Sequence, residues 1–152
     1  MYHLGPTWEE DIRELGCNML PEVIAEVRAS HNLSPVGALV HCINRSIETY
    51  TAAYDGQVLG IVGLVPGTIL GQWASPWLLT SPEAKDHPIY FVRVSKRLLN
   101  RWLKIYPILE NYVDARFDAS LKWAKAVGFE IHDAQPFGYA GLPFHRISIR
   151  GV

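Results

Sequence analysis

The side chains that could carry acid–base chemistry in this sequence lie near the ends of predicted strands. Glu48 opens one extended segment, Asp114 closes another, and His132 and His145 fall in the last two. A carboxylate or an imidazole in such a place could take a proton from an amine. No pairing between these groups is visible in the sequence, so polar residues on the surface or rim are the competing interpretation. The identity of a catalytic residue therefore stays open.

Cysteine and metal chemistry are not expected. Cys17 and Cys42 are the only two thiols, and neither belongs to a CxxC pair or to a spaced set of Cys and His ligands. His41 precedes Cys42, but adjacent helical residues point in different directions and make a poor pair of base and nucleophile. We expect two reduced, partly buried cysteines and no metal site.

A stripe of positive charge is the first candidate binding surface. Its members recur at three- and four-residue spacing, so on a helix they share the face opposite the apolar one. They are Arg93, Lys96, Arg97, Arg101 and Lys104. The stripe could dock an acidic partner or packed DNA, and a solvated helix surface is the alternative. Because the formal net charge is −1, any nucleic-acid binding would need such a local patch.

The segment QPFGYAGLPF, residues 135–144, is the second candidate binding surface. It combines three aromatic residues with two glycines and two prolines. Phe137 and Tyr139 are the candidate contacts, because exposed aromatic side chains on a preshaped loop often anchor a partner. A loop folded back onto the sheet is the alternative.

Four tryptophans could line a ligand cleft or belong to the core. They are Trp73, Trp77, Trp102 and Trp123.

Length and composition indicate one ordinary globular domain over residues 1–152. The sequence has 152 residues, of which 49% are hydrophobic, and this is ample material for a single core. We see no apolar run of about 20 residues and no charged-then-apolar leader, so we expect no membrane span and an intracellular, soluble protein.

Three short helices are predicted before any strand. TWEEDIREL, residues 7–15, begins with Thr7 as N-cap, and LPEVIAEVRAS, residues 20–30, follows. SPVGALVHCINRSI, residues 34–47, starts on Ser34 and Pro35, which suit the N-cap and the first helical position.

Three antiparallel strands are predicted next. IETYTAAY and QVLGIVGLV flank Asp55 and Gly56, a strong tight-turn pair, and so form a hairpin. TILGQWASPWLLT, residues 68–80, adds a third strand, in which Pro76 implies a bulge, a bend or an edge position.

The second half alternates helices and strands. SPEAKDHP is predicted to be a loop, and IYFVRVSKRLLNRWLKIY, residues 89–106, the longest helix. After the strand ILENYVDA, a helix runs from Asp118 as N-cap to Gly128, a left-handed C-cap that lets Phe129 pack back under the helix. FEIHDAQPF and PFHRISIRG are the last two strands. The fold class is α+β (α/β), with a central mixed, mostly antiparallel sheet of about six to seven strands flanked by helices.

This order of elements resembles the fold of the GCN5-related N-acetyltransferases (GNAT). The resemblance is carried by the strand NYVDA, by Ser120 and Trp123 in the following helix, and by Gly128-Phe129-Glu130. It implies that an active protein would bind acetyl-CoA. The implied cofactor-binding residues are Leu78, Leu79, Thr80, Ser81 and Lys85.

Two positions depart from the family pattern. The family's pyrophosphate loop reads Q/R-x-x-G-x-G/A, whereas SPEAKDHP has no glycine and carries Glu83 and Asp86. Ala124 occupies the position, four residues before the glycine of Gly-Phe, where the family often has a tyrosine that acts as general acid. No cofactor is therefore expected, and acetyl-CoA would be the cofactor if the protein is active.

A closer resemblance is to the small podovirus proteins of the internal virion protein A family. YPILENYVDARFDASLKWAKAVGFEIHDAQPF and FHRISIRG carry it, with a looser match in the basic helix and in WLLTS. It implies a bacteriophage protein that is non-catalytic and acts in virion assembly or as an internal or head–tail component. Its partners would be portal, internal core or tail proteins. It would be located in the host cytoplasm during assembly or in the virion. The competing hypothesis is an active N-acetyltransferase that modifies an amine of a host or phage target.

Overall fold

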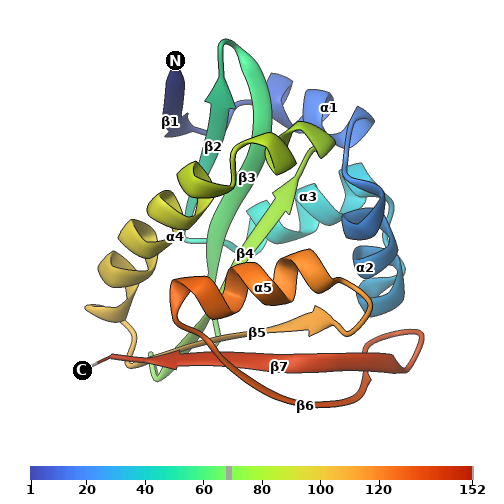
Figure 1. Ribbon diagram of the computed structural model, residues 1–152, viewed down its shortest axis with the longest axis vertical. Coiled ribbons are helices and arrows are strands. Elements are labelled where there is room, and N and C mark those ends of the chain that lie inside the picture. Colours follow the sequence, from blue (N-terminus) through green and yellow to red (C-terminus); the bar gives the residue numbers. More distant parts are fainter. Residues whose placement is uncertain (68–69, 152) are drawn as a thin grey trace.

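The computed structural model describes residues 1–67 and 70–151, which fold around one seven-stranded sheet (Figure 1). The strand order across the sheet is β1-β2-β3-β4-β5-β7-β6. Within the described residues, no helix is both long and apolar enough to cross a membrane. The elements in chain order are β1 (Tyr2–Pro6), α1 (Glu9–Cys17), α2 (Pro21–His31), α3 (Pro35–Arg45), β2 (Glu48–Tyr54), β3 (Gln57–Pro66), β4 (Trp73–Thr80), the 3-10 helix η1 (Pro82–Asp86), α4 (Pro88–Leu103), β5 (Ile108–Asp114), α5 (Asp118–Val127), β6 (Glu130–Phe137) and β7 (Leu142–Arg150).

The N-terminal helices are confirmed, but the prediction that no strand precedes them is wrong. β1 pairs antiparallel with β2 at the edge of the sheet. Gly5 and Pro6 within it argue against a strand in the sequence, and an edge strand tolerates them because one side needs no ladder hydrogen bonds. α1 begins at Glu9 rather than after Thr7, since the Asp11 carboxylate accepts the Trp8 N–H at 2.8 Å.

The predicted meander β2-β3-β4 is present. Asp55 and Gly56 take positive φ of 49° and 82° and form the tight turn between β2 and β3. The third strand is shorter than expected: β4 starts at Trp73, and residues 68–69 of the predicted strand lie outside the described residues. The edge interpretation of Pro76 is confirmed, because β4 pairs with β5 only at Trp73 and Ala74.

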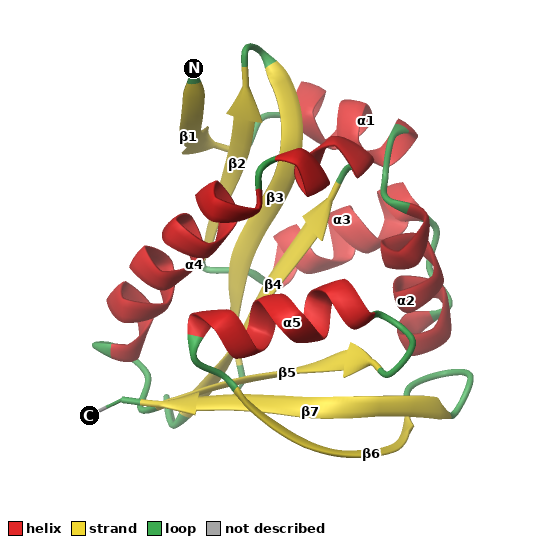
Figure 2. Cartoon of the chain, in the orientation of Figure 1, coloured by secondary structure: helices red, strands yellow, loops and turns green. Residues whose placement is uncertain are grey.

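The helices cover the two faces of the sheet separately (Figure 2). α4 and α5 pack on one face over a core that includes Leu64, Leu109 and Trp102, which are 0%, 0% and 1% exposed. α1, α2 and α3 pack on the other face. α4 is the longest helix, as predicted, but the predicted loop before it is wrong in part, because Pro82–Asp86 form the 3-10 helix η1.

The junction between α5 and β6 matches its prediction closely. Gly128 has φ of 109°, and the Phe129 N–H donates to the Ala124 carbonyl at 2.9 Å. Phe129 is buried against α5. The one correction is at the start of α5, where Phe117 holds the N-cap position and Asp118 is the first helical residue.

Candidate functional site

The sheet opens between β4 and β5. These parallel strands pair only at Trp73 with Ile108 and at Ala74 with Leu109, and then diverge (Figure 1). The Asn111 side chain spans the narrow end: its Nδ2 donates to the Pro76 carbonyl at 2.7 Å, and its Oδ1 accepts the Tyr112 N–H at 2.7 Å. Openings at the carboxyl ends of parallel strands are common ligand sites in α/β proteins.

A cavity of about 290 Å³ lies beside this opening, on the face covered by α2 and α3. Its walls combine large aromatic side chains with several ionisable ones. The aromatic residues are Trp73, Trp77, Tyr112, Phe137 and Phe144. The ionisable residues are Glu26, His31, His41, Cys42, Arg45, Glu110 and Tyr112. Trp73 thus lines a cleft, and Trp77 both lines it and belongs to the buried core of that face. Trp102 belongs to the core of the other face, and Trp123 packs against it.

Glu26 of α2 is the ionisable group best placed for proton transfer in this cavity. Its Oε2 accepts the N–H of Asp114, the last residue of β5, at 2.9 Å. Burial raises the pKa of Glu26 to about 7, against the lowering effect of that N–H, and the charge of Asp114 adds to the rise. A carboxylate with a pKa near neutrality can both accept and return a proton.

Sequence reasoning missed Glu26, although a signal was present. Val23 and Val27 are buried and Glu26 lies on the same side of α2. A glutamate at a core-facing position of an amphipathic helix is unusual, because a buried carboxylate loses its hydration. The apolar spacing defines the helix but does not by itself distinguish a glutamate that faces the core from one on the surface.

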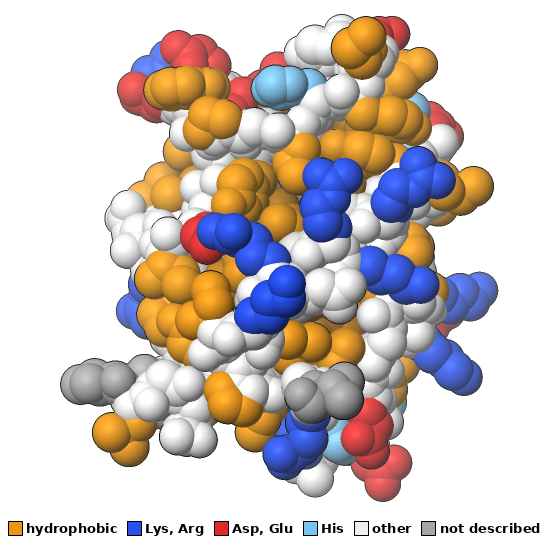
Figure 3. Space-filling model, turned by 90° about the vertical axis from the view of Figure 1, so that its left-hand side faces the viewer, with side chains coloured by type: hydrophobic (Ala, Val, Ile, Leu, Met, Phe, Trp, Pro, Cys, Tyr) orange, Lys and Arg blue, Asp and Glu red, His pale blue; other side chains and the backbone are white. Residues whose placement is uncertain are grey.

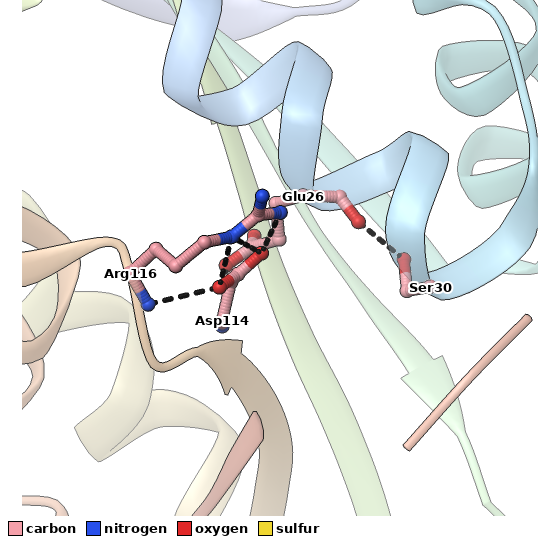
Figure 4. Close-up of polar contacts among 4 residues, drawn as sticks. All are labelled: Glu26, Ser30, Asp114 and Arg116. Atoms are coloured by element: carbon pink, nitrogen blue, oxygen red, sulfur yellow. Dashed lines mark hydrogen bonds and ion pairs between the residues drawn. The ribbon is translucent and has the colours of Figure 1, made fainter. Parts of the chain in front are cut away.

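Asp114 forms a bidentate ion pair at the end of β5 (Figure 4). Arg116 Nε and Nη2 donate to its carboxylate at 3.0 and 2.7 Å, and the Arg116 N–H adds a bond of 2.9 Å. Burial would raise the pKa of Asp114, but these bonds and the charge of Arg116 outweigh it, so the pKa is lowered. Asp114 therefore stays ionised and is a weak base. Its catalytic role remains an untested prediction, and its surroundings favour a structural one.

Glu48 lies on the opposite face of the sheet from Glu26. Its carboxylate accepts bonds from Arg101 at 3.0 and 3.2 Å, from the Tyr50 hydroxyl at 2.8 Å and from Trp102 Nε1 at 3.2 Å. The Arg101 bonds, which outweigh partial burial, lower the pKa of Glu48. Glu48 thus ties β2 to α4, and it also engages Arg101, one of the predicted partner-binding residues.

His132 and His145 lie on β6 and β7. His132 Nε2 is 2.8 Å from Ser148 Oγ, and His145 Nδ1 is 2.7 Å from the His132 carbonyl oxygen. The pairing of β6 with β7 is irregular between Ile131 and Ala134, and His132 lies in this interruption. It lines a second cavity of about 440 Å³, which shares Tyr112, Phe137 and Phe144 with the first. Of the predicted catalytic residues, Asp114 lies at the end of β5 beside the opening, His132 lies on the edge strand β6 and lines the second cavity, and Glu48 lies on the other face of the sheet.

The two interpretations of the aromatic segment 135–144, a loop folded back on the protein and an exposed anchor for a partner, apply to different residues. It folds back on α2, where the Tyr139 and Ala140 N–H groups donate to the Ser30 and Ala29 carbonyls, each at 2.9 Å. Phe137 stacks on Tyr112 inside the cleft, with ring centroids 3.9 Å apart. Tyr139 remains 73% exposed, so it alone presents an aromatic ring to a partner.

The strand edge implied for acetyl-CoA is largely occupied. The Thr80 carbonyl accepts the Leu20 N–H at 2.9 Å, and Pro76 has no N–H to offer. Leu79 is buried under the N-terminal helices, and the Leu78 side chain packs against residues of α4. Backbone groups alternate in direction along a strand, so Leu78 is the one residue between Pro76 and Thr80 whose backbone faces the opening.

Ser81 and Lys85, the other implied cofactor residues, also have partners within the chain. Ser81 is 1% exposed and donates its N–H to the Leu59 carbonyl at 2.9 Å. Lys85 lies 3.7 Å from the Glu22 carboxylate of α2. Both therefore help join η1 to the rest of the protein.

The start of α4 does not fit a pyrophosphate. The segment SPEAKDHP and the first turn of α4 that follows it contain no glycine, and that first turn holds Pro88 and Tyr90. Pro88 offers no N–H, and Tyr90 stacks on Tyr2 with ring centroids 4.0 Å apart. The Tyr2 hydroxyl lies 2.6 Å from His87 Nδ1. Aromatic side chains thus occupy the place of a glycine cradle, and the buried Ala124 supplies no acid.

Comparisons with known proteins identify the fold. No protein-family model matches the chain, and no curated protein matches it. A spermidine N-acetyltransferase from Vibrio cholerae, solved with CoA and spermine, matches 98% of this chain and 95% of its own, with a TM-score of 0.72 at 14% identity. A protein assigned as a phosphinothricin N-acetyltransferase matches 100% of this chain and 99% of its own, with a TM-score of 0.72 at 12% identity. The smu.2055 protein of Streptococcus mutans matches 97% of this chain and 98% of its own, with a TM-score of 0.74 at 11% identity. The chain therefore has the fold of the GNAT acetyltransferases.

Proposed function

We propose that this chain is a non-catalytic bacteriophage protein with the acetyltransferase fold, acting through protein contacts in virion assembly or as an internal or head–tail component. The phage assignment rests on the resemblance of residues 106–137 and 144–151 to the internal virion protein A family. The observation that carries the non-catalytic part is the start of α4. Pro88 and the stacked Tyr90 stand there in place of the glycines that would cradle a pyrophosphate.

The remaining cofactor-side residues support the same proposal. Thr80, Ser81 and Lys85 all have partners inside the protein. Tyr139 offers an exposed aromatic ring on a loop held by two backbone hydrogen bonds. A rigid loop with an exposed aromatic side chain can dock on a portal, internal core or tail protein at low entropic cost.

Acetyl-CoA binding tests the loss of the cofactor site. We expect thermal shift and calorimetry to show no saturable stabilisation by acetyl-CoA. The proposal fails if the wild-type protein is stabilised and Ile89→Glu is not. Ile89 is 73% exposed in the first turn of α4, and its carboxylate variant would repel a phosphate there. Ile105→Glu, a change of the 54%-exposed isoleucine just beyond the other end of α4, is the matched control.

Particle composition tests the assembly role. We expect the tagged chain to co-purify with portal, internal core or tail proteins from cells infected by the encoding phage. We expect Tyr139→Ala to reduce this co-purification without changing stability. Finding the chain neither in particles nor in assembly intermediates would refute the role.

An active N-acetyltransferase is the second candidate, favoured by Glu26. A carboxylate with a pKa of about 7 at the sheet opening is suited to take the proton from an ammonium group in the cavity. The test is mass spectrometry of polyamines and lysine peptides incubated with the protein and acetyl-CoA. Acetylated product from the wild-type protein, absent with Glu26→Gln, would select this candidate over the first.

A further inference from the structure

The exposed side of α4 carries a concentrated positive charge. We call Arg93, Lys96, Arg97 and Lys104 the basic face; all four side chains are exposed. α4 contains no acidic residue. Figure 3 shows Lys and Arg side chains spread over the side of the molecule where α4 lies, with acidic side chains mainly towards its upper and lower edges. Although the net charge is −1, positive charge is therefore concentrated on one side of the protein.

The basic face is not neutralised within the protein. Among residues 1–67 and 70–151, no carboxylate lies within 4.0 Å of the charged nitrogens of the basic face, whereas the neighbouring Arg101 is paired with Glu48. Screening confines charge effects in solution to about 10 Å at moderate salt, so this local group decides what binds here. A ligand bearing several negative charges would find four cations available.

A second copy of the chain is a poor complement to the basic face. Four of the fifteen acidic residues lie on α1, and the other eleven are spread over the remaining elements and turns. Of the four on α1, three already have partners. Glu9 is paired with Arg13, Asp11 accepts the Trp8 N–H, and Glu14 accepts the Val58 N–H at 2.6 Å. Charge complementarity therefore points to an external polyanion.

The geometry of the basic face suits the backbone of a nucleic-acid duplex. With a rise of about 1.5 Å per residue, the eleven steps from Arg93 to Lys104 span about 16 Å. At about 3.4 Å per phosphate along one strand, that length faces roughly four or five phosphates. None of the exposed aromatic residues Tyr2, Trp8, Tyr54 and Tyr139 belongs to α4. Tyr2 lies against the start of α4, but its ring is already stacked on Tyr90 with ring centroids 4.0 Å apart. A site for single strands would need aromatic rings on which bases could stack.

We propose that the basic face of α4 binds the phosphate backbone of double-stranded DNA without reading its sequence. This inference goes beyond the assembly role and does not depend on it. It also does not involve the cavity, which lies on the opposite face of the sheet. Arginine and lysine bind phosphates through charge and hydrogen bonds, and nothing in the basic face is shaped for base edges.

Fluorescence anisotropy with labelled duplexes of about 20 base pairs and unrelated sequences is the test, starting at about 50 mM salt. We expect binding of similar affinity to each duplex, with a slope of log K against log salt of roughly −4, from about four phosphate contacts. The double variant Arg93→Gln and Arg97→Gln should bind about tenfold or more weakly and reduce the slope by about 2. Arg93→Lys with Arg97→Lys should retain the binding.

The matched control removes the same charge elsewhere. Arg13→Gln with Arg28→Gln changes two exposed arginines on α1 and α2 and should leave the affinity within about twofold. Urea unfolding checks that all variants are folded. Four outcomes would overturn the proposal: no binding at low salt, equal loss in both glutamine doubles, tighter binding to single-stranded DNA, or tighter binding to an acidic peptide.

Discussion

The two faces of the sheet differ in what they enclose. On the face of α4 and α5, Trp102, Leu64 and Leu109 form a closely packed core, and polar groups such as Glu48 are tied by several hydrogen bonds. On the face of α1, α2 and α3, the helices also pack on buried residues of the sheet, but a cavity of about 290 Å³ lies between α2, α3 and the opening in the sheet. Glu26 lies there with a pKa raised by burial.

The two faces also differ in how they compare with an acetyltransferase scaffold. The opening between β4 and β5 and a ligand-sized cavity remain. The start of α4, which would hold the cofactor's pyrophosphate, is filled by stacked aromatic rings. A hollow on one face thus coexists with a filled helix start on the other, because the packing of one face does not require the other.

Truncation of tryptophans on the two faces should give the largest effects and a direct comparison. Trp102→Ala removes a 1%-exposed ring and its bond to Glu48, so we expect unfolding to become easier by about 3–5 kcal/mol. Trp73→Ala enlarges an existing cavity, so we expect less than half that loss. Urea unfolding measures both. Equal losses would show that the two faces are packed alike.

Glu26→Gln should stabilise the protein in a pH-dependent way. The folded pKa of about 7 exceeds the ordinary 4.5, so the folded state holds an extra proton between these values and loses stability as pH rises through them. Glutamine cannot ionise and still accepts the Asp114 N–H. We expect a gain of about 1–3 kcal/mol near pH 8 that shrinks near pH 5. A gain independent of pH would contradict the raised pKa.

Arg116→Ala should show the opposite pH response. The lowered pKa of Asp114 means that its pairing with Arg116 contributes stability above pH 3.8 and loses it as pH falls through the folded pKa. We expect a loss of stability near neutral pH, larger than that of an exposed ion pair, that declines in acid. Arg13→Ala, which breaks the exposed pair with Glu9, is the control and should cost at most about 0.5 kcal/mol. A loss that persists at low pH would assign Arg116 to packing instead.

The sequence predicted the elements that local chemistry determines. Gly128 must adopt a left-handed conformation, and Asp55 with Gly56 makes a tight turn, so both junctions were correct. β1 was missed because its pairing with β2 is a contact between residues about 50 positions apart. Asp114 was placed at the right strand end, but Arg116 and Glu26, which determine its environment, reach it from a loop and from α2. Glu26 became significant only through tertiary burial, which no spacing in the sequence specifies.

The smallest expected stability effect separates the two aromatic residues of the β6–β7 loop. Tyr139 is 73% exposed and its loop is held by backbone bonds, so Tyr139→Ala should change the free energy of unfolding by less than about 0.5 kcal/mol. Phe137→Ala removes the stack on Tyr112 and should cost clearly more. Urea unfolding of both variants, together with co-purification from infected cells, distinguishes their roles. A stable Tyr139→Ala protein that no longer enters particles would assign the ring to a partner, whereas a large loss of stability would place it in the cleft wall with Phe137.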